Sequence, residues 1–224
     1  MRVEHPLVIP ADRERQAQLG LEPTAAGSEC EASLRQDASR VFFSARMRSA
    51  ELACPKVQER PPPPGRWLRM EPYEGLLPHG EHFRCALALR RFDAEGVELH
   101  LSELSGHLEL AQGKSSRSML TRPTLLDGML QVCSLHALRT RGTWGLPQSA
   151  QRVLLVAGGL GRSDALDCRI CLVEEGRYDV LACSEDGSPV VEIGGLSLAE
   201  AADRDDCELA RQRLERLLQG ALAP

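Results

Sequence analysis

The amino-acid sequence, 224 residues long, predicts an α+β fold in which an antiparallel sheet wraps around a single buried helix. One observation is the segment 123–139, PTLLDGMLQVCSLHALR, which has a helical pattern and is apolar nearly all round. A helix without a polar face is buried on most sides. The other observation is a set of short segments rich in β-forming residues, separated by glycine and Asp-Gly turns. We therefore expect the helix to lie inside a curved antiparallel sheet.

Residues 1–58 are expected to form a partial unit built from strands alone. Strand-like segments occur at 3–10, 15–23, 30–36 and 40–47, and the last two are separated by a sequence typical of a hairpin turn. The segment 59–67, ERPPPPGRW, follows them. Four consecutive prolines cannot join a helix or a central strand, so this segment predicts a stiff polyproline II linker. A ligand for a proline-binding module is the less favoured alternative.

Residues 68–200 are expected to form the main unit, and residues 201–224 an amphipathic helix. Strands are predicted at 83–92 and 97–104 with a turn at 93–96, then the helix, which GTWGLPQ closes with glycines and a proline. Four further strands are predicted in QRVLLVAG, DCRICLVEE, YDVLACSEDG and PVVEIGGLSLAEA. The C-terminal helix has alternating charges along an apolar stripe, so it could pack on this unit or lead toward another module.

Composition excludes several classes of function. The formal net charge is −5 and aromatic residues make up only 4% of the chain, which argues against nucleic acid as a partner. No apolar run approaches the roughly 20 residues that a membrane-spanning helix needs. The first residues, MRVEHPLVIPADRER, lack the long apolar centre of a signal peptide. We therefore expect no membrane partner and a cytoplasmic location.

The cysteine and histidine spacings do not predict a metal site. Cys168 and Cys171 form a CxxC pair, but the surrounding residues indicate a strand, in which residues three apart point to opposite faces. No second CxxC and no nearby histidine completes a ligand set. His79 and His82 lie three apart in a predicted loop, and two histidines without a third ligand are a weak signal.

Asp127 and Gln131 are the polar pair that the predicted helix leaves to be explained. Thr124 and Asp127 fit a T-x-x-D capping box, which would make Asp127 a first-turn residue favoured by the helix dipole. Asp127 and Gln131 are also one helical turn apart and share a face. A carboxylate on a buried helix needs a partner, and the Gln131 amide can donate a hydrogen bond to it. Asp127 could therefore be part of the helix start or a catalytic acid, and both interpretations can be true together.

Four segments of the chain, in order, resemble the dehydratase domains of polyketide synthases. PYEGLLPHGEHFRCALAL, with Tyr73, Gly80 and Phe83, resembles the start of the second half of that domain. RPTLLDGMLQVC resembles its central-helix motif, GLPQSAQRV its Leu-Pro step into the next strand, and EDGSPVVEIGGLSLAEA its closing strand. The resemblance covers residues 73–200, and residues 1–54 resemble only the trailing strands of the first half. It implies a double hotdog, two helix-in-sheet units side by side.

The resemblance implies dehydration of a β-hydroxyacyl chain carried on the phosphopantetheine of an acyl carrier protein, with no other cofactor. Asp127 would help to expel the hydroxyl group as water, and Gln131 would orient Asp127. The substrate channel would include Tyr73, His79, Gly80, Phe83 and Pro123. The implied partners are the acyl carrier protein and the other domains of the synthase. A homodimer is a further assembly that the resemblance suggests. Polyketide and fatty acid biosynthesis are the implied pathways.

The chain departs from the family in its first half. There the family carries its catalytic histidine in an HxxxGxxxxP pattern, followed by a first central helix, and this sequence contains neither. We therefore expect an incomplete catalytic pair, with His79 or His82 as weak substitutes. The alternatives are a hotdog that serves as a scaffold or docking domain of the synthase, and a related cyclase or isomerase.

Overall fold

The computed structural model describes most of the residues of the chain. These are 2–3, 18–23, 29–37, 40–48, 67–77, 83–103, 109–110, 114–115, 122–156, 164–174, 176–200 and 204–222. The predicted linker at 59–67 lies outside this set except for Trp67, and so do His79, Gly80 and His82.

The strands and helices follow the predicted order, strands first, then a helix, further strands and a second helix. In chain order they are β1 (Arg2–Val3), β2 (Gln18–Pro23), β3 (Glu29–Asp37), β4 (Arg40–Arg48), β5 (Leu68–Met70), β6 (Cys85–Phe92), β7 (Gly96–Glu103), β8 (Glu109–Leu110), β9 (Lys114–Ser115), α1 (Pro123–Arg141), β10 (Gly145–Ser149), β11 (Arg152–Leu155), β12 (Ala165–Glu174), β13 (Arg177–Cys183), β14 (Pro189–Glu200) and α3 (Arg204–Leu222).

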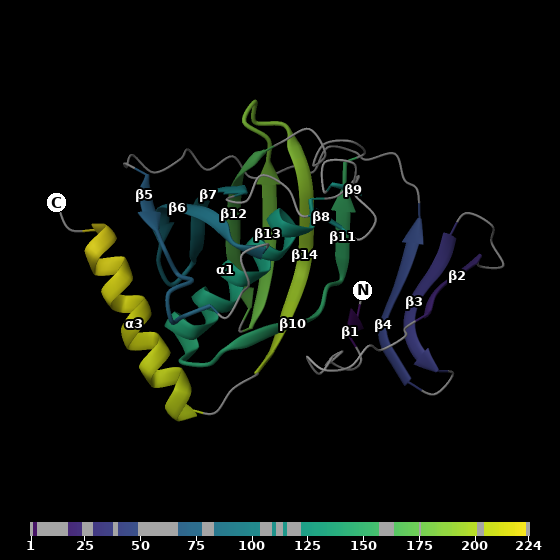
Figure 1. Ribbon diagram of the computed structural model, residues 1–224, viewed down its shortest axis with the longest axis horizontal. Helices are drawn as coiled ribbons and strands as arrows, with labels where there is room; N and C mark the ends of the chain where they lie inside the picture. Colours follow the sequence, from purple (N-terminus) through teal and green to yellow (C-terminus); the bar gives the residue numbers. More distant parts are fainter. Residues whose placement is uncertain are drawn as a thin grey trace.

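Nearly all the strands belong to one antiparallel sheet of twelve, in the order β2-β3-β4-β1-β10-β14-β13-β12-β7-β6-β5, with β11 beside β14. Strand β1 joins β2–β4 to the rest of the sheet, because Arg2 pairs with Ser44 of β4 and with Ser149 of β10. Figure 1 shows α1 inside the curve of the sheet, with α3 at one side of the molecule and β2–β4 at the other. The predicted α+β arrangement is therefore confirmed.

The core lies between α1 and the concave face of the sheet. Alternate residues of the strands around α1 point inward, as in β6, where Cys85, Leu87 and Leu89 are buried and the residues between them are not. On α1 itself Leu125, Met129, Val132, Cys133, Leu135 and Leu138 are fully buried. Burial of each large apolar side chain stabilises the fold by about 1.5–3 kcal/mol. The apolar surface of α1 is thus what holds the sheet curved around it.

Gly128 lets α1 approach the sheet closely. A β-carbon added at this position would lie 3.0 Å from the Cys85 sulfur and 3.0 Å from a methyl carbon of Leu101, both of which are buried. The sheet therefore passes over the helix at a point where the helix has no side chain.

The start of α1 corrects the predicted capping box. The N-cap residue is Arg122, with extended backbone, no side-chain capping bond forms, and Pro123 takes the first helical position. Proline is favoured there because its missing N–H has no partner in a helix anyway. Thr124 is consequently inside the helix, and Asp127 lies beyond its first turn. At the other end Gly142 has a φ of +68° and its N–H donates to the Leu138 carbonyl, as the predicted glycine stop requires.

Two further elements refine the predictions. Residues expected only to close the helix form strand β10, which pairs with β14 and accommodates Pro147 next to an irregularity in register. The C-terminal helix α3 packs on the main unit, because Cys207, Leu214 and Leu218 are buried and Glu215 pairs with Arg139 of α1 at 2.9 Å. Packing on this unit was the first of the two predicted alternatives.

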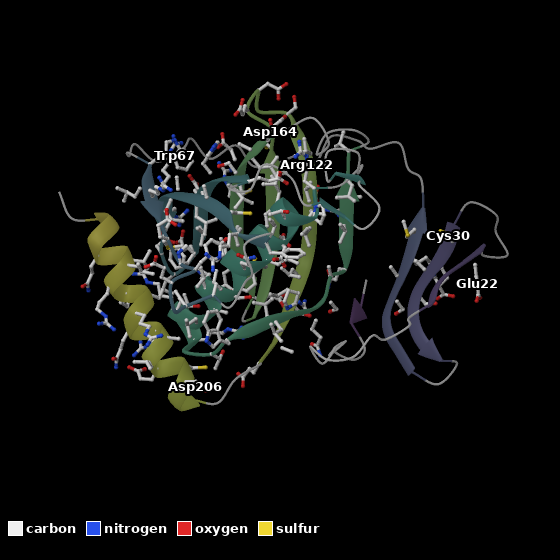
Figure 2. The ribbon with its side chains drawn as sticks, in the orientation of Figure 1. Glu22, Cys30, Trp67, Arg122, Asp164 and Asp206 are labelled. Carbon is white, nitrogen blue, oxygen red and sulfur yellow. The ribbon has the colours of Figure 1, made fainter. Side chains whose placement is uncertain are left out.

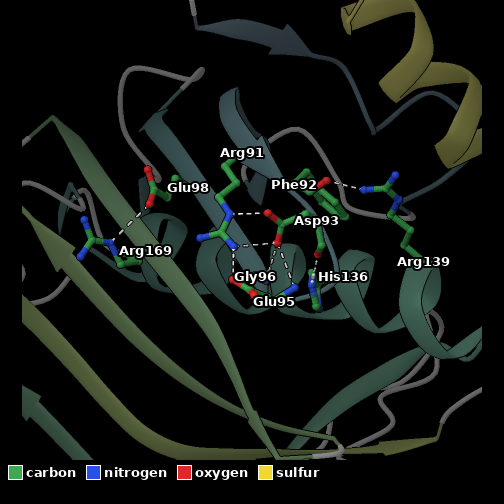
Figure 3. A network of polar contacts seen from close by, with 9 residues as sticks. All are labelled: Arg91, Phe92, Asp93, Glu95, Gly96, Glu98, His136, Arg139 and Arg169. Carbon is green, nitrogen blue, oxygen red and sulfur yellow. Dashed lines mark hydrogen bonds and ion pairs between the residues drawn. The ribbon is translucent and has the colours of Figure 1, made fainter. Parts of the chain in front are cut away.

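His136 anchors the C-terminal half of α1 inside the sheet. Its Nε2 lies 2.8 Å from the carbonyl oxygen of Asp93 in the β6–β7 turn, and its Nδ1 lies 3.1 Å from the Tyr178 hydroxyl of β13. A carbonyl oxygen only accepts, so Nε2 donates, and in the neutral imidazole Nδ1 then accepts from the Tyr178 hydroxyl. Figure 3 shows the contact of His136 with Asp93 beside Arg139, which donates to the Phe92 carbonyl. Burial lowers the pKa of His136 and keeps the ring neutral.

We expect Gly128→Leu to lower the free energy of unfolding by about 1–3 kcal/mol, because the added side chain overpacks the contact with Cys85 and Leu101. Leucine is a good helix former, so a loss cannot come from helix propensity. Urea unfolding followed by circular dichroism measures the change. Gln219→Leu, which adds the same side chain to the exposed part of α3, is the control. Equal stabilities of the two variants would contradict the close approach.

We expect stability to fall as the pH drops from about 6.5, the ordinary pKa of histidine in the unfolded chain, toward the lowered pKa of His136 in the folded chain. In that window the unfolded chain binds the extra proton, so acid favours unfolding. Urea unfolding at a series of pH values measures the slope. His136→Gln should reduce it. Equal slopes for wild type and His136→Gln would contradict the assignment.

Candidate active site around Asp127 and Gln131

The side chain of Gln131 is the centre of a buried hydrogen-bond network on α1. Gln131 is only 3% exposed. Its Nε2 donates to Asp127 Oδ2 at 2.6 Å and to the Phe83 carbonyl oxygen at 3.1 Å. Its Oε1 accepts from the Tyr73 hydroxyl at 3.0 Å. Both amide hydrogens and the amide oxygen therefore have partners.

Tyr73 reaches this network from the turn that follows β5. Its hydroxyl oxygen accepts from the backbone N–H of Cys85 at 2.8 Å, where β6 begins. Burial raises the pKa of Tyr73 well above its usual range, so the hydroxyl keeps its proton. With that proton it donates a hydrogen bond to Gln131. The network therefore joins a turn, a strand and the central helix.

The orientation of the Gln131 amide follows from its partners. The Phe83 carbonyl only accepts, so the amide nitrogen must face it, and the amide oxygen must then face the Tyr73 hydroxyl. As a result, Asp127 receives an N–H and not an oxygen. Such a donor stabilises the ionised carboxylate, the form that a proton-donating acid reaches when its proton has left.

The Cys85 thiol lies close to this carboxyl group but is not a nucleophile. Its sulfur donates to the Thr124 carbonyl at 3.3 Å. Burial, with a smaller effect from the charges of Glu103 and Asp127, raises the pKa of the thiol to about 12. Near neutral pH the group stays a thiol, so the chemistry available here is that of an acid and an amide donor.

The structure brings together several of the residues that the sequence singled out. Asp127, Gln131, Tyr73 and Phe83 belong to one network, with Phe83 taking part through its carbonyl group. Pro123 begins the same helix, one turn before Asp127. His79 and Gly80 lie outside the described residues.

The two histidines of the described part of the chain are engaged elsewhere. His100 pairs with Asp167 at 2.9 Å and packs its ring edge-on against Trp67. His136 is held by Tyr178 and Asp93 in the C-terminal half of α1. Neither interaction includes Asp127 or Gln131.

Arg122, which sequence analysis missed, holds the start of α1. Its side chain is 2% exposed and pairs with Glu103 of β7 at 2.9 Å and with Asp164, before β12, at 2.8 Å. Figure 2 shows Arg122 and Asp164 together beside the upper ends of the strands. An arginine in front of a helix is usually exposed, so no local pattern marks it as buried. These ion pairs fix the end of the helix that carries Asp127.

The described residues include no group of three or more cysteine, histidine or acidic side chains arranged to hold a metal ion. Cys168 and Cys171 both lie in β12, the first buried and the second exposed, as the strand interpretation predicts. In the part of the chain that the structure describes, no helix is long and apolar enough to cross a membrane.

The fold is that of the dehydratase domains of polyketide synthases. It matches the dehydratase domain from the CurF module of curacin polyketide synthase with a TM-score of 0.68 and 14% identity, over 90% of this chain and 74% of that one. It matches the dehydratase domain of RzxB from Pseudomonas fluorescens with a TM-score of 0.66 and 16% identity, over 88% of this chain and 73% of that one. The bifunctional dehydratase-cyclase domain of ambruticin biosynthesis matches with a TM-score of 0.61 and 20% identity, over 90% of this chain and 74% of that one.

These similarities confirm the predicted hotdog fold, an antiparallel sheet wrapped around a central helix. No protein-family model matches the sequence, and no curated protein matches it. At these levels of identity the likeness shows the fold alone.

We expect Arg122→Met to lower the free energy of unfolding by about 3–5 kcal/mol, because it leaves the buried Glu103 carboxylate without its partner. Thermal or urea unfolding measures the loss. Arg69→Met is the matched control, since it breaks an exposed pair with Glu71 and should cost less than about 1 kcal/mol. Similar losses in the two variants would show that Arg122 does not anchor the helix.

Proposed function

We propose that the chain is a dehydratase-like domain of a polyketide or polyunsaturated fatty acid type synthase, which contributes the acid half of a dehydratase site. The substrate is a β-hydroxyacyl thioester on the phosphopantetheine of an acyl carrier protein. The observation that carries the proposal is the hydrogen bond from Gln131 to Asp127 at 2.6 Å, on the central helix of a dehydratase fold. The other synthase domains are the remaining proposed partners, and the cytoplasm the proposed location.

Asp127 acts as the general acid in this proposal. Protonated Asp127 gives its proton to the β-hydroxyl group, the carbon–oxygen bond breaks, and water leaves. A base removes the α-proton, and the electron pair of that carbon–hydrogen bond becomes the new double bond. Asp127 ends as a carboxylate, which the N–H of Gln131 stabilises.

The sequence lacks the histidine motif that supplies the base in the family. The sequence has no HxxxGxxxxP, and His100 and His136 have other partners in the described part of the chain. We propose a histidine imidazole from another polypeptide or segment as the base.

The same observations favour a second candidate, a non-catalytic hotdog that serves as a scaffold or docking domain of the synthase. In that case Gln131 and Asp127 would be a remnant of the acid site. A cyclase or isomerase is supported more weakly, by the likeness to a bifunctional dehydratase-cyclase domain.

We expect Asp127→Asn to lower the dehydration rate of a β-hydroxyacyl pantetheine thioester by about 10²–10⁴-fold, the range of general acid catalysis. The ultraviolet absorbance of the enoyl thioester measures the product. Imidazole, added at increasing concentration, stands in for the base and should raise the rate of wild type but not of Asp127→Asn.

Asp206→Asn makes the same chemical change on the exposed face of α3 and should behave as wild type. Equal rates for Asp127→Asn and wild type would remove Asp127 from the mechanism. Turnover that stays at the level of buffer with imidazole, in both proteins, would favour the scaffold.

A further inference from the structure

We infer that Tyr73 is a positioning residue for Asp127, which acts by holding the amide of Gln131 in one orientation. This inference rests on the proposed function for its catalytic consequence, but its structural part can be tested without turnover. Tyr73 is 8% exposed and its hydroxyl has two protein partners.

The Tyr73 hydroxyl supplies the donor that Gln131 Oε1 needs in a buried site. Without the hydroxyl group, that oxygen and the Cys85 N–H would both lose a partner. Leaving such groups unsatisfied is costly, and the amide would lose one of its three restraints. The remaining acceptors, Asp127 and the Phe83 carbonyl, would hold the amide nitrogen on the same side, but the amide would move over a wider range. Asp127 would then have a weaker donor for its ionised form.

The turn that carries Tyr73 is itself held on both sides. Within residues 71–77, the Gly75 N–H donates to the Tyr73 carbonyl at 3.1 Å and the Leu77 N–H to the Pro72 carbonyl at 3.0 Å. Arg213 of α3 donates to the Gly75 carbonyl at 2.6 Å, and Gly75 has a φ of +76°, which favours glycine. A fixed turn gives the hydroxyl group a defined position, which a device for orienting an amide requires.

Tyr178 provides a matched control, because the chain has only two tyrosines and both lie in the core. The Tyr178 hydroxyl bonds to His136 Nδ1 at 3.1 Å, away from Gln131 on the same helix. Tyr178→Phe therefore removes a buried, hydrogen-bonded hydroxyl group from the same core without touching the Gln131 amide.

The first experiment follows the side-chain amide hydrogens of Gln131 by nuclear magnetic resonance, with Gln131→Ala to assign them. In wild type we expect slow exchange with solvent, since both hydrogens have protein acceptors. Tyr73→Phe should accelerate the exchange at least about tenfold, the expected result of losing one buried hydrogen bond. Tyr178→Phe should leave it unchanged. Unchanged exchange in Tyr73→Phe would overturn the inference.

The second experiment is a double-mutant cycle on dehydration, with imidazole present. Tyr73→Phe should lower kcat about tenfold with little change in KM, and Gln131→Ala should lower it at least as much. Because Tyr73 acts through Gln131, the double variant should be no slower than Gln131→Ala alone. Additive losses would mean a general structural role and would overturn the inference.

The two experiments separate this inference from the proposed function. A mobile amide in Tyr73→Phe, together with no turnover by any protein, would leave the positioning of Gln131 established and the dehydratase proposal refuted. Should Tyr73→Phe fail to fold, Arg213→Ala releases the turn from α3 at an exposed position and should accelerate amide exchange in the same direction. An unchanged amide in that variant would count against the inference.

Discussion

Burial of α1 is the constraint on which the rest of the structure depends. The helix lies inside the sheet with almost no exposed face, so each polar side chain on it must find a partner there. Ser134 meets this requirement with the carbonyls of Leu130 and Gly145, Gln131 with Tyr73, Phe83 and Asp127, and His136 with Tyr178 and Asp93. The candidate site is therefore one of several places where the buried helix is tied to the sheet by polar contacts.

The partners of the helix come from segments far apart in the chain, which links the site to the whole topology. Tyr73 and Gln131 are 58 positions apart, and His136 and Tyr178 are 42 apart. The antiparallel register of β6, β7, β12 and β13 brings these segments to the same helix. A shift of one residue in any of these strands would turn its inward residues to the outer face and remove the partners.

Sequence reasoning reached the elements and the Asp127–Gln131 pair because both depend on local patterns. The apolar helix, the glycine stop at Gly142 and the strands with alternating residues all show in short windows. The capping box was wrong because Pro123 begins the helix one residue before Thr124, and proline competes well for that position. The Tyr73 bond and the buried Arg122 were out of reach, since each depends on residues that meet only in the folded chain.

Gly128 has a consequence for how the site can vary among related proteins. It stands next to Asp127 in the helix, and Cys85 and Leu101 fill the space where its side chain would lie. The depth at which the acid sits below the sheet is thus set by the summed volume of three neighbouring positions. In a related protein, larger or smaller side chains at these three positions would change the distance between the acid and the sheet, while the acid and its amide partner stay the same.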